Sequence, residues 1–344
     1  MRHFGDVSCR NLSADSLASF LRDAGSNQSR ALVYASTLGF DELTEKPSIV
    51  IFPGLSYGTD VSSDADSSSS LGWWESIVGP GRPIDTRRYL VHTFGLYPED
   101  SCGPKPDNAV LLGPSSLCIS AFASLVRDHL GNSGVRKIDA LIGTSFGSLP
   151  ATELACLTSP FTIDRLVFIC GGITHTPYTL LLRSITDTLL NPRSGISSNL
   201  ALRLSRQMSL LLYGSPSAFE RRQETIPLFD PIHWADRKAD KHSDRFSPDY
   251  TRDLNRMALL APEFLSLDSL QRNHPNLTVH QIVCPSDVLY GIVAAKNTRR
   301  LLDEHGVHTL ESIFASLDGH DAFLTDQQRL APLITETLRK DIAG

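Results

Sequence analysis

The sequence predicts an α/β fold in which a mostly parallel central sheet is flanked by helices. Residues 143–147 (Gly-Thr-Ser-Phe-Gly) follow an apolar stretch at 138–142 and precede a helical pattern at 150–156 that opens with proline, as at a strand-to-helix turn. Residues 49–52 (Ile-Val-Ile-Phe) are continuously apolar, which is typical of a strand covered on both faces. Such strands alternate with helical patterns along most of the chain, so we expect residues 1–344 to form one domain.

Ser145 lies where the predicted strand must turn sharply into the helix. Bulkier residues at Gly143 or Gly147 would collide with the adjoining strand and helix. The turn lifts the hydroxyl clear of the sheet and directs the first amide N–H groups of the helix at the same space. Those groups can stabilise a negatively charged oxygen, so Ser145 is a candidate nucleophile. By itself, Gly-x-Ser-x-Gly is also compatible with an ordinary glycine-flanked turn.

The composition is that of an ordinary globular protein. The chain carries a formal net charge of -6, with 41% hydrophobic and 20% charged residues. No basic block stands out, which argues against nucleic acid or an anionic membrane as a partner. The apolar runs are too short to span a bilayer, and residues 1–6 lack the apolar core of a secretory signal. Six cysteines are scattered without Cys-x-x-Cys spacing, so we expect reduced thiols and a cytoplasmic location.

Further elements follow from the periodicity of the apolar residues. The expected strands are 30–37, 48–52, 89–94, 138–142, 165–170, 277–283 and 311–315. The expected helices are 115–130, 150–156, 292–305 and a closing helix around 330–338. The stretch 95–114 is rich in Pro, Gly and Asp, and we expect it to be a loop.

Residues 173–263 break this α/β alternation. The stretch is helical in pattern and rich in arginine, is interrupted by prolines, and contains no strand of the earlier kind. We expect it to form an inserted helical cap over the active edge of the sheet. There it can exclude water and shape a pocket.

A serine hydroxyl needs a base to take its proton, and that base needs an anion to fix its tautomer. In serine enzymes of the strand–turn–helix type, the chain order is serine, acid, histidine. Asp287 and His320 each follow an expected strand in that order, so Ser145, Asp287 and His320 are the candidate triad. Asp287 is equally suited to cap the following helix. His175 and His233 are rival bases, but both lie in the expected cap and lack a preceding strand.

Backbone amides are the expected oxyanion donors. One is the N–H of Phe146, and the other is the N–H of Leu55, in the loop after the first buried strand. Trp73, beside a serine-rich stretch, is a candidate pocket residue, although such tryptophans more often anchor a loop to the core. The sequence has no metal-ligand spacing and no Gly-x-Gly-x-x-Gly, so we expect neither a metal nor a resident cofactor.

Five stretches carry a family likeness: Pro-Gly-Leu-Ser (53–56), Gly-Trp-Trp (72–74) with 77–89, the serine turn, Ser-Asp-Val-Leu-Tyr (286–290) and Gly-His-Asp-Ala-Phe-Leu (319–324). With these stretches the chain resembles the homoserine O-acetyltransferase family, acyltransferases with the α/β-hydrolase fold. The likeness runs from about residue 31 to the C-terminal helix.

The resemblance implies the same triad and a ping-pong transfer. An acyl thioester such as acetyl-CoA would load Ser145, and an acceptor hydroxyl would then take the acyl group. Acyl-CoA is thus expected as a co-substrate. The family's acid after the catalytic histidine helps to hold the acceptor's amine, a role that would fall to Asp321.

The cap departs from the family pattern at one substrate-binding segment. Family members carry Tyr-Arg-Ser, whose arginine binds the homoserine carboxylate, whereas residues 213–215 are Tyr-Gly-Ser. Tyr213 remains a candidate substrate-binding residue. Losing a buried carboxylate clamp costs about several kcal/mol, so we expect an acceptor other than homoserine. Arg203, Arg206 and Arg221 are candidate substitutes, although a solvated cap surface is the simpler explanation for them.

Three functional hypotheses follow. The first is a serine-dependent O-acyltransferase, and the second is an ester or thioester hydrolase that uses the same triad with water as the acceptor. The third is a catalytically silent scaffold, against which the complete triad argues. The sequence leaves the acceptor and the choice between monomer and homodimer open.

Overall fold

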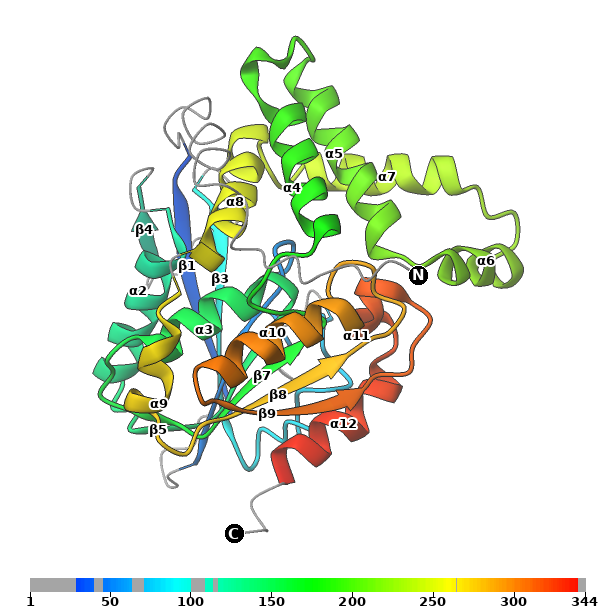
Figure 1. The fold of residues 1–344 in the computed structure, drawn as a ribbon. Helices are drawn as coiled ribbons and strands as arrows, with labels where there is room; N and C mark the ends of the chain where they lie inside the picture. Colours follow the sequence, from blue (N-terminus) through cyan, green and yellow to red (C-terminus); the bar gives the residue numbers. More distant parts are fainter. Residues whose placement is uncertain are drawn as a thin grey trace, which may run out of the picture.

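A twisted central sheet forms the core of the molecule (Figure 1). The computed structural model describes residues 29–39, 46–63, 71–99, 109–113, 117–263 and 265–339. The strands in this part of the chain are β1 (Ala31–Leu38), β2 (Ser48–Phe52), β3 (Leu90–Pro98), β4 (Val110–Leu112), β5 (Lys137–Thr144), β6 (Thr162–Ile163), β7 (Arg165–Ile169), β8 (Thr278–Val283) and β9 (His308–Ile313).

The strand order is β4-β1-β3-β2-β5-β7-β8-β9, with β6 paired to β5. Neighbours from β3 to β9 are parallel, and β1 is antiparallel to both β3 and β4. The prediction of a mostly parallel sheet is therefore confirmed. Because the carboxyl ends of parallel strands share one edge, the loops after β2, β5, β8 and β9 are placed together.

The two faces of the sheet bury alternate residues of each strand. In β2, Val50 and Phe52 belong to one apolar cluster, whereas Ile49 and Ile51 belong to the other, as the two-residue period of a strand requires. The helices outside the cap are α2 (Ile119–Asn132), α3 (Ser148–Cys156), α9 (Leu270–Asn273), α10 (Ile292–Glu304), α11 (Ala322–Thr325) and α12 (Gln327–Arg339). Of these, α2 and α3 cover the first face and α12 covers the second.

Two expectations about the strands were wrong. Residues 95–114 are not simply a loop, because β3 continues to Pro98 and β4 forms a further strand that pairs with β1. β3 continues past Gly95 because it pairs with β1 along nearly its whole length. On these two strands, the rings of Tyr34 and Tyr97 stack with centroids 4.4 Å apart. The strand expected at 311–315 begins at 308 and ends at 313, because it follows β8 in parallel register.

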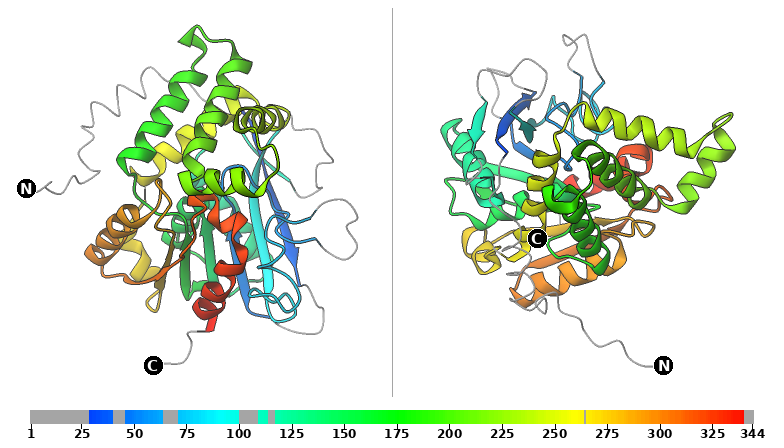
Figure 2. Two further views of the ribbon diagram at one scale, coloured as in Figure 1. Left: turned by 90° about the vertical axis from the view of Figure 1, so that its right-hand side faces the viewer. Right: turned by 90° about the horizontal axis from the view of Figure 1, so that it is seen from above.

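Five of the helices between β7 and β8 in the described chain form the cap. They are α4 (Pro177–Leu190), α5 (Ser198–Tyr213), α6 (Pro216–Thr225), α7 (Pro231–Ser243) and α8 (Pro248–Leu260). All but α5 begin with proline in the first turn, where its missing N–H costs nothing. Figures 1 and 2 show the cap at one end of the sheet, with α6 and α7 projecting to one side.

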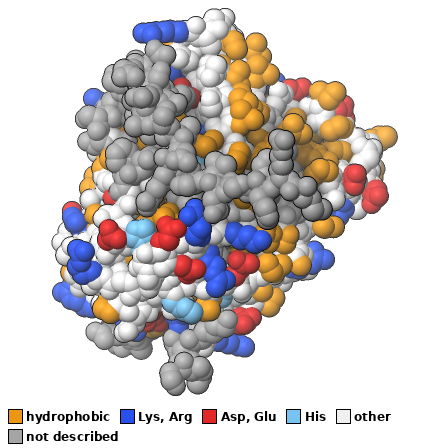
Figure 3. Space-filling model, viewed as in Figure 1, with side chains coloured by type: hydrophobic (Ala, Val, Ile, Leu, Met, Phe, Trp, Pro, Cys, Tyr) orange, Lys and Arg blue, Asp and Glu red, His pale blue; other side chains and the backbone are white. Residues whose placement is uncertain are grey.

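Apolar side chains gather on the outer surface of the cap (Figure 3). The exposed large ones on α4, α5 and the α6–α7 region are Tyr178, Leu181, Ile185, Leu200, Leu204, Leu211, Ile226, Leu228 and Ile232. Among the described residues, no helix combines the length and apolar character needed to cross a bilayer. Cys118, Cys156, Cys170 and Cys284 are free thiols, and the other two cysteines lie outside the described residues.

Candidate active site

A sharp turn at the end of β5 carries Ser145. The strand leads directly into a short 3₁₀ helix (Ser145–Gly147) and then into α3. Ser145 has φ +52°, a left-handed conformation that is costly for a residue with a side chain. A Cβ atom at Gly143 would lie 2.5 Å from the Cα of Ser148, and one at Gly147 would lie 2.1 Å from the carbonyl oxygen of Phe52. Both glycines are therefore needed for this close approach of backbones.

The structure brings the three candidate triad residues together. The Nε2 atom of His320 lies 2.7 Å from the Oγ of Ser145, and its Nδ1 atom lies 2.8 Å from Asp287 Oδ2. Asp287 follows β8, and His320 lies in a 3₁₀ helix (Gly319–Asp321) after β9. Both side chains are buried, whereas Ser145 is partly exposed.

Asp287 is fixed in place by the backbone that follows it. Its Oδ1 atom accepts the N–H groups of Leu289 at 2.8 Å and Tyr290 at 3.0 Å. One oxygen therefore closes the turn ahead of α10 while the other faces the imidazole. The alternative interpretation of Asp287 as the cap of the following helix is wrong, because the N-cap of α10 is Gly291.

The electrostatic environment of His320 favours its charged form. Burial by itself lowers the pKa of this imidazole, but the adjacent Asp287 carboxylate and the charge of Asp321 outweigh that effect and raise the pKa above its usual value. The charge of Arg183 acts in the opposite direction. An imidazole that gains a proton readily, held against a serine hydroxyl, is suited to general-base chemistry.

The predicted oxyanion donors lie beside the serine. Leu55 follows Gly54, where a Cβ atom would be 3.5 Å from the Cβ of Ser145. Within the described chain, no hydrogen bond uses the N–H of Leu55 or of Phe146. The N–H of Phe146 belongs to the first turn of a helix, where such groups lack an intrahelical acceptor. Both groups are therefore free to bind a substrate oxygen.

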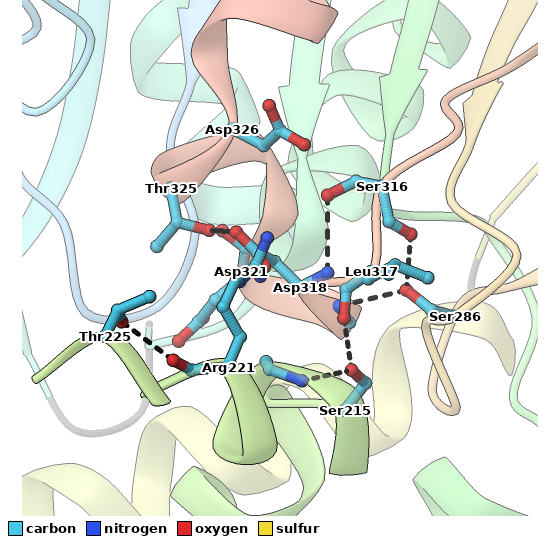
Figure 4. A network of polar contacts seen from close by, with 12 residues as sticks. Ser215, Arg221, Thr225, Ser286, Ser316, Leu317, Asp318, Asp321, Thr325 and Asp326 are labelled. Atoms are coloured by element: carbon cyan, nitrogen blue, oxygen red, sulfur yellow. Dashed lines mark hydrogen bonds and ion pairs between the residues drawn. The ribbon is translucent and has the colours of Figure 1, made fainter. Parts of the chain in front are cut away.

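The loop ahead of His320 is bonded to the cap (Figure 4). The Ser215 hydroxyl donates to the carbonyl of Leu317, and the Arg221 guanidinium pairs with Asp318. Gly319 has φ +73°, and a Cβ atom there would lie 2.7 Å from the amide nitrogen of Ser215. The start of α6 therefore sits directly on the loop that presents the imidazole.

The same loop is bonded to the loop that carries the acid (Figure 4). The Ser286 hydroxyl donates to the carbonyl of Ser316 at 2.8 Å and accepts the N–H of Gly319 at 3.0 Å. These bonds join the residue before Asp287 to the residue before His320. They fix the spacing of the acid and the base independently of the contact between the two side chains.

A pocket with about 560 Å³ of empty space opens between the cap and the sheet. Leu55 and Tyr213 belong to its lining, and the Tyr213 ring lies 5.1 Å from the His320 ring. The remaining lining residues are Ser56, Leu182, Arg183, Thr186, Ser205, Arg206, Ser209, His242, Phe246, Thr251, Leu254 and Asn255. The cap thus supplies most of a cavity that ends beside the triad.

Asp321 and Trp73, two further predicted site residues, have different surroundings. Asp321 is close enough to contribute to the raised pKa of Tyr57, which burial above all brings to about 12. Trp73 lies outside the pocket lining. Its indole N–H donates to the carbonyl of Gly58 at 3.0 Å, and its ring packs against Tyr57 and Trp74. The structure therefore places Trp73 as an anchor of the loop after β2.

The rival histidines lie away from Ser145. The Nε2 atom of His175 is 2.8 Å from the Leu259 carbonyl, and burial followed by the charge of Arg183 lowers its pKa to about 4. His233 is exposed on α7. Arg183 itself is a pocket residue that sequence reasoning missed. The available signal was its place in α4, one residue after the inward-facing Leu182, but that pattern does not distinguish a pocket from a core.

The fold defines the class to which the protein belongs, which is that of chains with the α/β-hydrolase fold. Esterase E22 matches the structure with a TM-score of 0.72 and 19% identity, over 89% of this chain and 94% of that one. The homoserine O-acetyltransferase of Bacillus anthracis matches with a TM-score of 0.71 and 16% identity, over 91% and 94%. No family model matches the sequence.

The proteins with similar sequences are acyltransferases. A serine O-succinyltransferase of Litchfieldella anticariensis is 26% identical over 329 residues, which cover 84% of this chain and 88% of that protein. One from Xylella fastidiosa is 25% identical over 361 residues, with 93% and 95% covered. The predicted resemblance to acyltransferases of the homoserine O-acetyltransferase-like type with the α/β-hydrolase fold is thereby confirmed.

Proposed function

We propose that the protein transfers an acyl group from an acyl-CoA, through an acyl ester on Ser145, to a hydroxyl acceptor. The observation that carries this proposal is the continuous chain of contacts from Ser145 through His320 to Asp287, at 2.7 and 2.8 Å, beside a pocket built by the cap. The acyltransferase relatives support it.

In the first half of the reaction His320 acts as a general base. Its Nε2 atom takes the proton of Ser145 Oγ while that oxygen attacks the thioester carbonyl carbon. The carbonyl oxygen becomes negatively charged and is stabilised by the N–H groups of Leu55 and Phe146. The carbon–sulfur bond then breaks, and the leaving thiolate receives the proton from the imidazolium. The products are free CoA and an acyl-Ser145 ester.

In the second half the acceptor hydroxyl replaces the thioester. His320 takes the hydroxyl proton, the acceptor oxygen attacks the ester carbonyl, and the Ser145 oxygen leaves with the proton. The family resemblance supports Asp321 as the residue that holds an amine of the acceptor, and Tyr213, whose ring lies 5.1 Å from the imidazole, belongs to the pocket wall. If water occupied the acceptor's place, the same steps would give hydrolysis. The fold shared with esterase E22 makes this hydrolase reaction the second candidate.

The choice of donor and acceptor rests on different observations. The family resemblance implies acetyl-CoA, whereas the names of the relatives favour succinyl-CoA and serine. Homoserine is disfavoured because Gly214 replaces the arginine of the family segment. A Cβ atom at Gly214 would lie 2.8 Å from the Phe219 ring, so that ring occupies the space of a longer side chain. We therefore propose a hydroxyl acceptor other than homoserine.

The decisive experiment is mass spectrometry of the protein after mixing with acetyl-CoA or succinyl-CoA. We expect the mass of one acyl group on the peptide that contains Ser145, and its loss on addition of L-serine with formation of the O-acyl product. Ser145→Ala removes the label, and Ser76→Ala, at an exposed serine, retains it. CoA release at the same rate with and without any alcohol would instead establish hydrolysis. Labelling that survives in Ser145→Ala would overturn the nucleophile assignment.

A further inference from the structure

Two groups of arginines in the cap differ in whether they have carboxylate partners. Those of the first group have carboxylate partners. For example, Arg256 Nε lies 2.7 Å from an oxygen of the buried Asp187, and Arg203 Nη2 lies 3.1 Å from Asp236. The described cap arginines with such a partner are Arg203, Arg221, Arg252 and Arg256. Each of these guanidinium groups therefore already has a carboxylate partner within the protein.

Arg183 and Arg206 form the second group. In the described chain neither makes an ion pair, and the Nε atom of each is buried without a hydrogen-bond partner. Arg183 is 8% exposed, and its side-chain partners are the neutral groups of Asn255, with Nη1 3.3 Å from Oδ1, and Tyr290. The guanidinium of Arg206 lies over the Tyr213 ring, 5.9 Å from its centroid.

Both of these arginines line the pocket beside the triad, and no Asp or Glu is among the described residues of its lining. Desolvation and then the charge of Arg206 lower the pKa of His242, another lining residue, to about 3, so this imidazole is neutral at pH 7. The two guanidinium groups therefore give the pocket a positive electrostatic potential. Buried charges without partners are costly, and an anion with several acceptor atoms would satisfy the unused N–H donors.

The position of the pocket limits what that anion can be. Tyr213 touches both the pocket and the His320 ring, and Leu55 joins the pocket to the residue beside Ser145. An anionic group of the substrate that is held here must therefore be separated by only a few covalent bonds from the carbonyl carbon that reacts at Ser145. The phosphates of an acyl-CoA are separated from its thioester by the long pantetheine arm. A carboxylate on the acyl group or on the acceptor fits the short distance.

We propose that Arg183 and Arg206 together form a subsite for a carboxylate of the substrate. This inference rests on the proposed acyl transfer and specifies its substrate class. The carboxylate belongs either to the far end of a dicarboxylic acyl group or to an amino-acid acceptor. Both sources offer the same planar pair of oxygens, which matches the fork of a guanidinium.

The test compares substrates that differ only in the carboxylate. In the first half-reaction, acylation by succinyl-CoA is compared with acylation by acetyl-CoA. In the second, the acyl-enzyme is offered L-serine or ethanolamine. We expect Arg206→Met to raise KM about 10- to 100-fold for the carboxylate-bearing member of one pair. We expect a change of less than about 3-fold for its carboxylate-free partner, and partial recovery in Arg206→Lys, which keeps the charge.

Arg183→Met should show the same selectivity. Its melting temperature is measured alongside, because Arg183 is buried and bonded to Asn255. Arg237→Met, at an exposed arginine on α7, is the matched control and should leave every KM unchanged. Equal effects of Arg206→Met on both members of each pair, or no effect on any, would overturn the subsite.

A binding measurement separates this subsite from the transfer reaction. In Ser145→Ala protein no acylation occurs, so calorimetry can compare succinate and L-serine with ethanolamine. We expect at least one of the two carboxylates to bind more tightly than ethanolamine, and this preference to disappear in the Ser145→Ala/Arg206→Met double variant. A preference that persists in the double variant would overturn the subsite. Failure of Ser145 labelling in the unmodified protein would overturn the transfer proposal alone.

Discussion

The triad and the cap pocket are held in place by different forces. Ser145 is positioned by backbone: a strand in the middle of the sheet, a left-handed turn and two glycines that let chains approach to contact. The pocket is positioned by side chains on helices, including buried pairs such as Arg256 with Asp187. Backbone geometry tolerates few alternatives, whereas side-chain pairs can be rearranged one helix at a time. Under the proposed function, we therefore expect the sheet edge to make the Ser145 hydroxyl reactive and the cap to select the substrate.

The largest effect is expected for Asp287→Asn, which tests the triad at the sheet edge. The amide can still accept N–H bonds from Leu289 and Tyr290, but it cannot stabilise a charged imidazole and favours the wrong tautomer of His320. We expect the rate of Ser145 acylation to fall about 10⁴-fold while the melting temperature changes little. Stopped-flow measurement of CoA release gives the rate. A loss below about 10-fold would mean that the carboxylate chiefly closes the turn ahead of α10.

The backbone requirement can be tested at Gly143. A Cβ atom there meets the Cα of Ser148 and the carbonyl oxygen of Gly147 at 2.5 and 2.6 Å, so Gly143→Ala should destabilise the fold by about 1–3 kcal/mol. Chemical denaturation measures this change. Gly113→Ala is the control, because no atom lies within 4 Å of a Cβ at that site. Equal stability of the two variants would show that the turn adapts more easily than the contacts indicate.

The pH dependence of acylation tests the link between the two regions. His320 must be neutral to take the Ser145 proton, so acylation should rise with pH through a pKa above the usual histidine value of about 6.5. Asp321→Asn removes a negative charge that raises this pKa and should move the rise to lower pH. Arg183→Met removes a positive charge that lowers it and should move the rise to higher pH. Because the acceptor is omitted, neither shift reports on acceptor binding, and shifts in the same direction would contradict these roles.

The smallest effect is expected at the bond between the cap and the histidine loop. Arg221 is 44% exposed where it pairs with Asp318, and such pairs contribute about 0.2–1 kcal/mol. Arg221→Gln should therefore lower kcat by about 2- to 5-fold at low salt, and by less at high salt, where screening already weakens the pair in the unmodified protein. Single-turnover acylation checks the effect. A change in KM without a change in kcat would indicate that Arg221 contacts the substrate and does not position His320.

Much of the fold and triad could be predicted because each rests on local chemistry. The continuous apolar run of β2 and the glycines around Ser145 leave few alternatives, and chain order then indicates Asp287 and His320. The cap pocket could not be predicted in the same way. Arg206 and Arg221 look alike in sequence, yet one lines the pocket and the other pairs with a loop 97 residues further along the chain. Which partner an arginine finds depends on helix packing that no short pattern encodes.

The close contact between Gly319 and the backbone of residues 213–215 has a consequence for engineering. Because a Cβ atom at Gly319 would lie 2.7 Å from main-chain atoms of Tyr213 and Ser215, the loop and the start of α6 leave no room for a side chain between them. In a chimaera with a cap from another protein between β7 and β8, the backbone of that cap would not match the loop around Gly319. The loop would then shift, and the His320 imidazole would move away from the Ser145 hydroxyl. Exchanging substrate preference between relatives therefore requires transplanting residues 316–319 along with the helices.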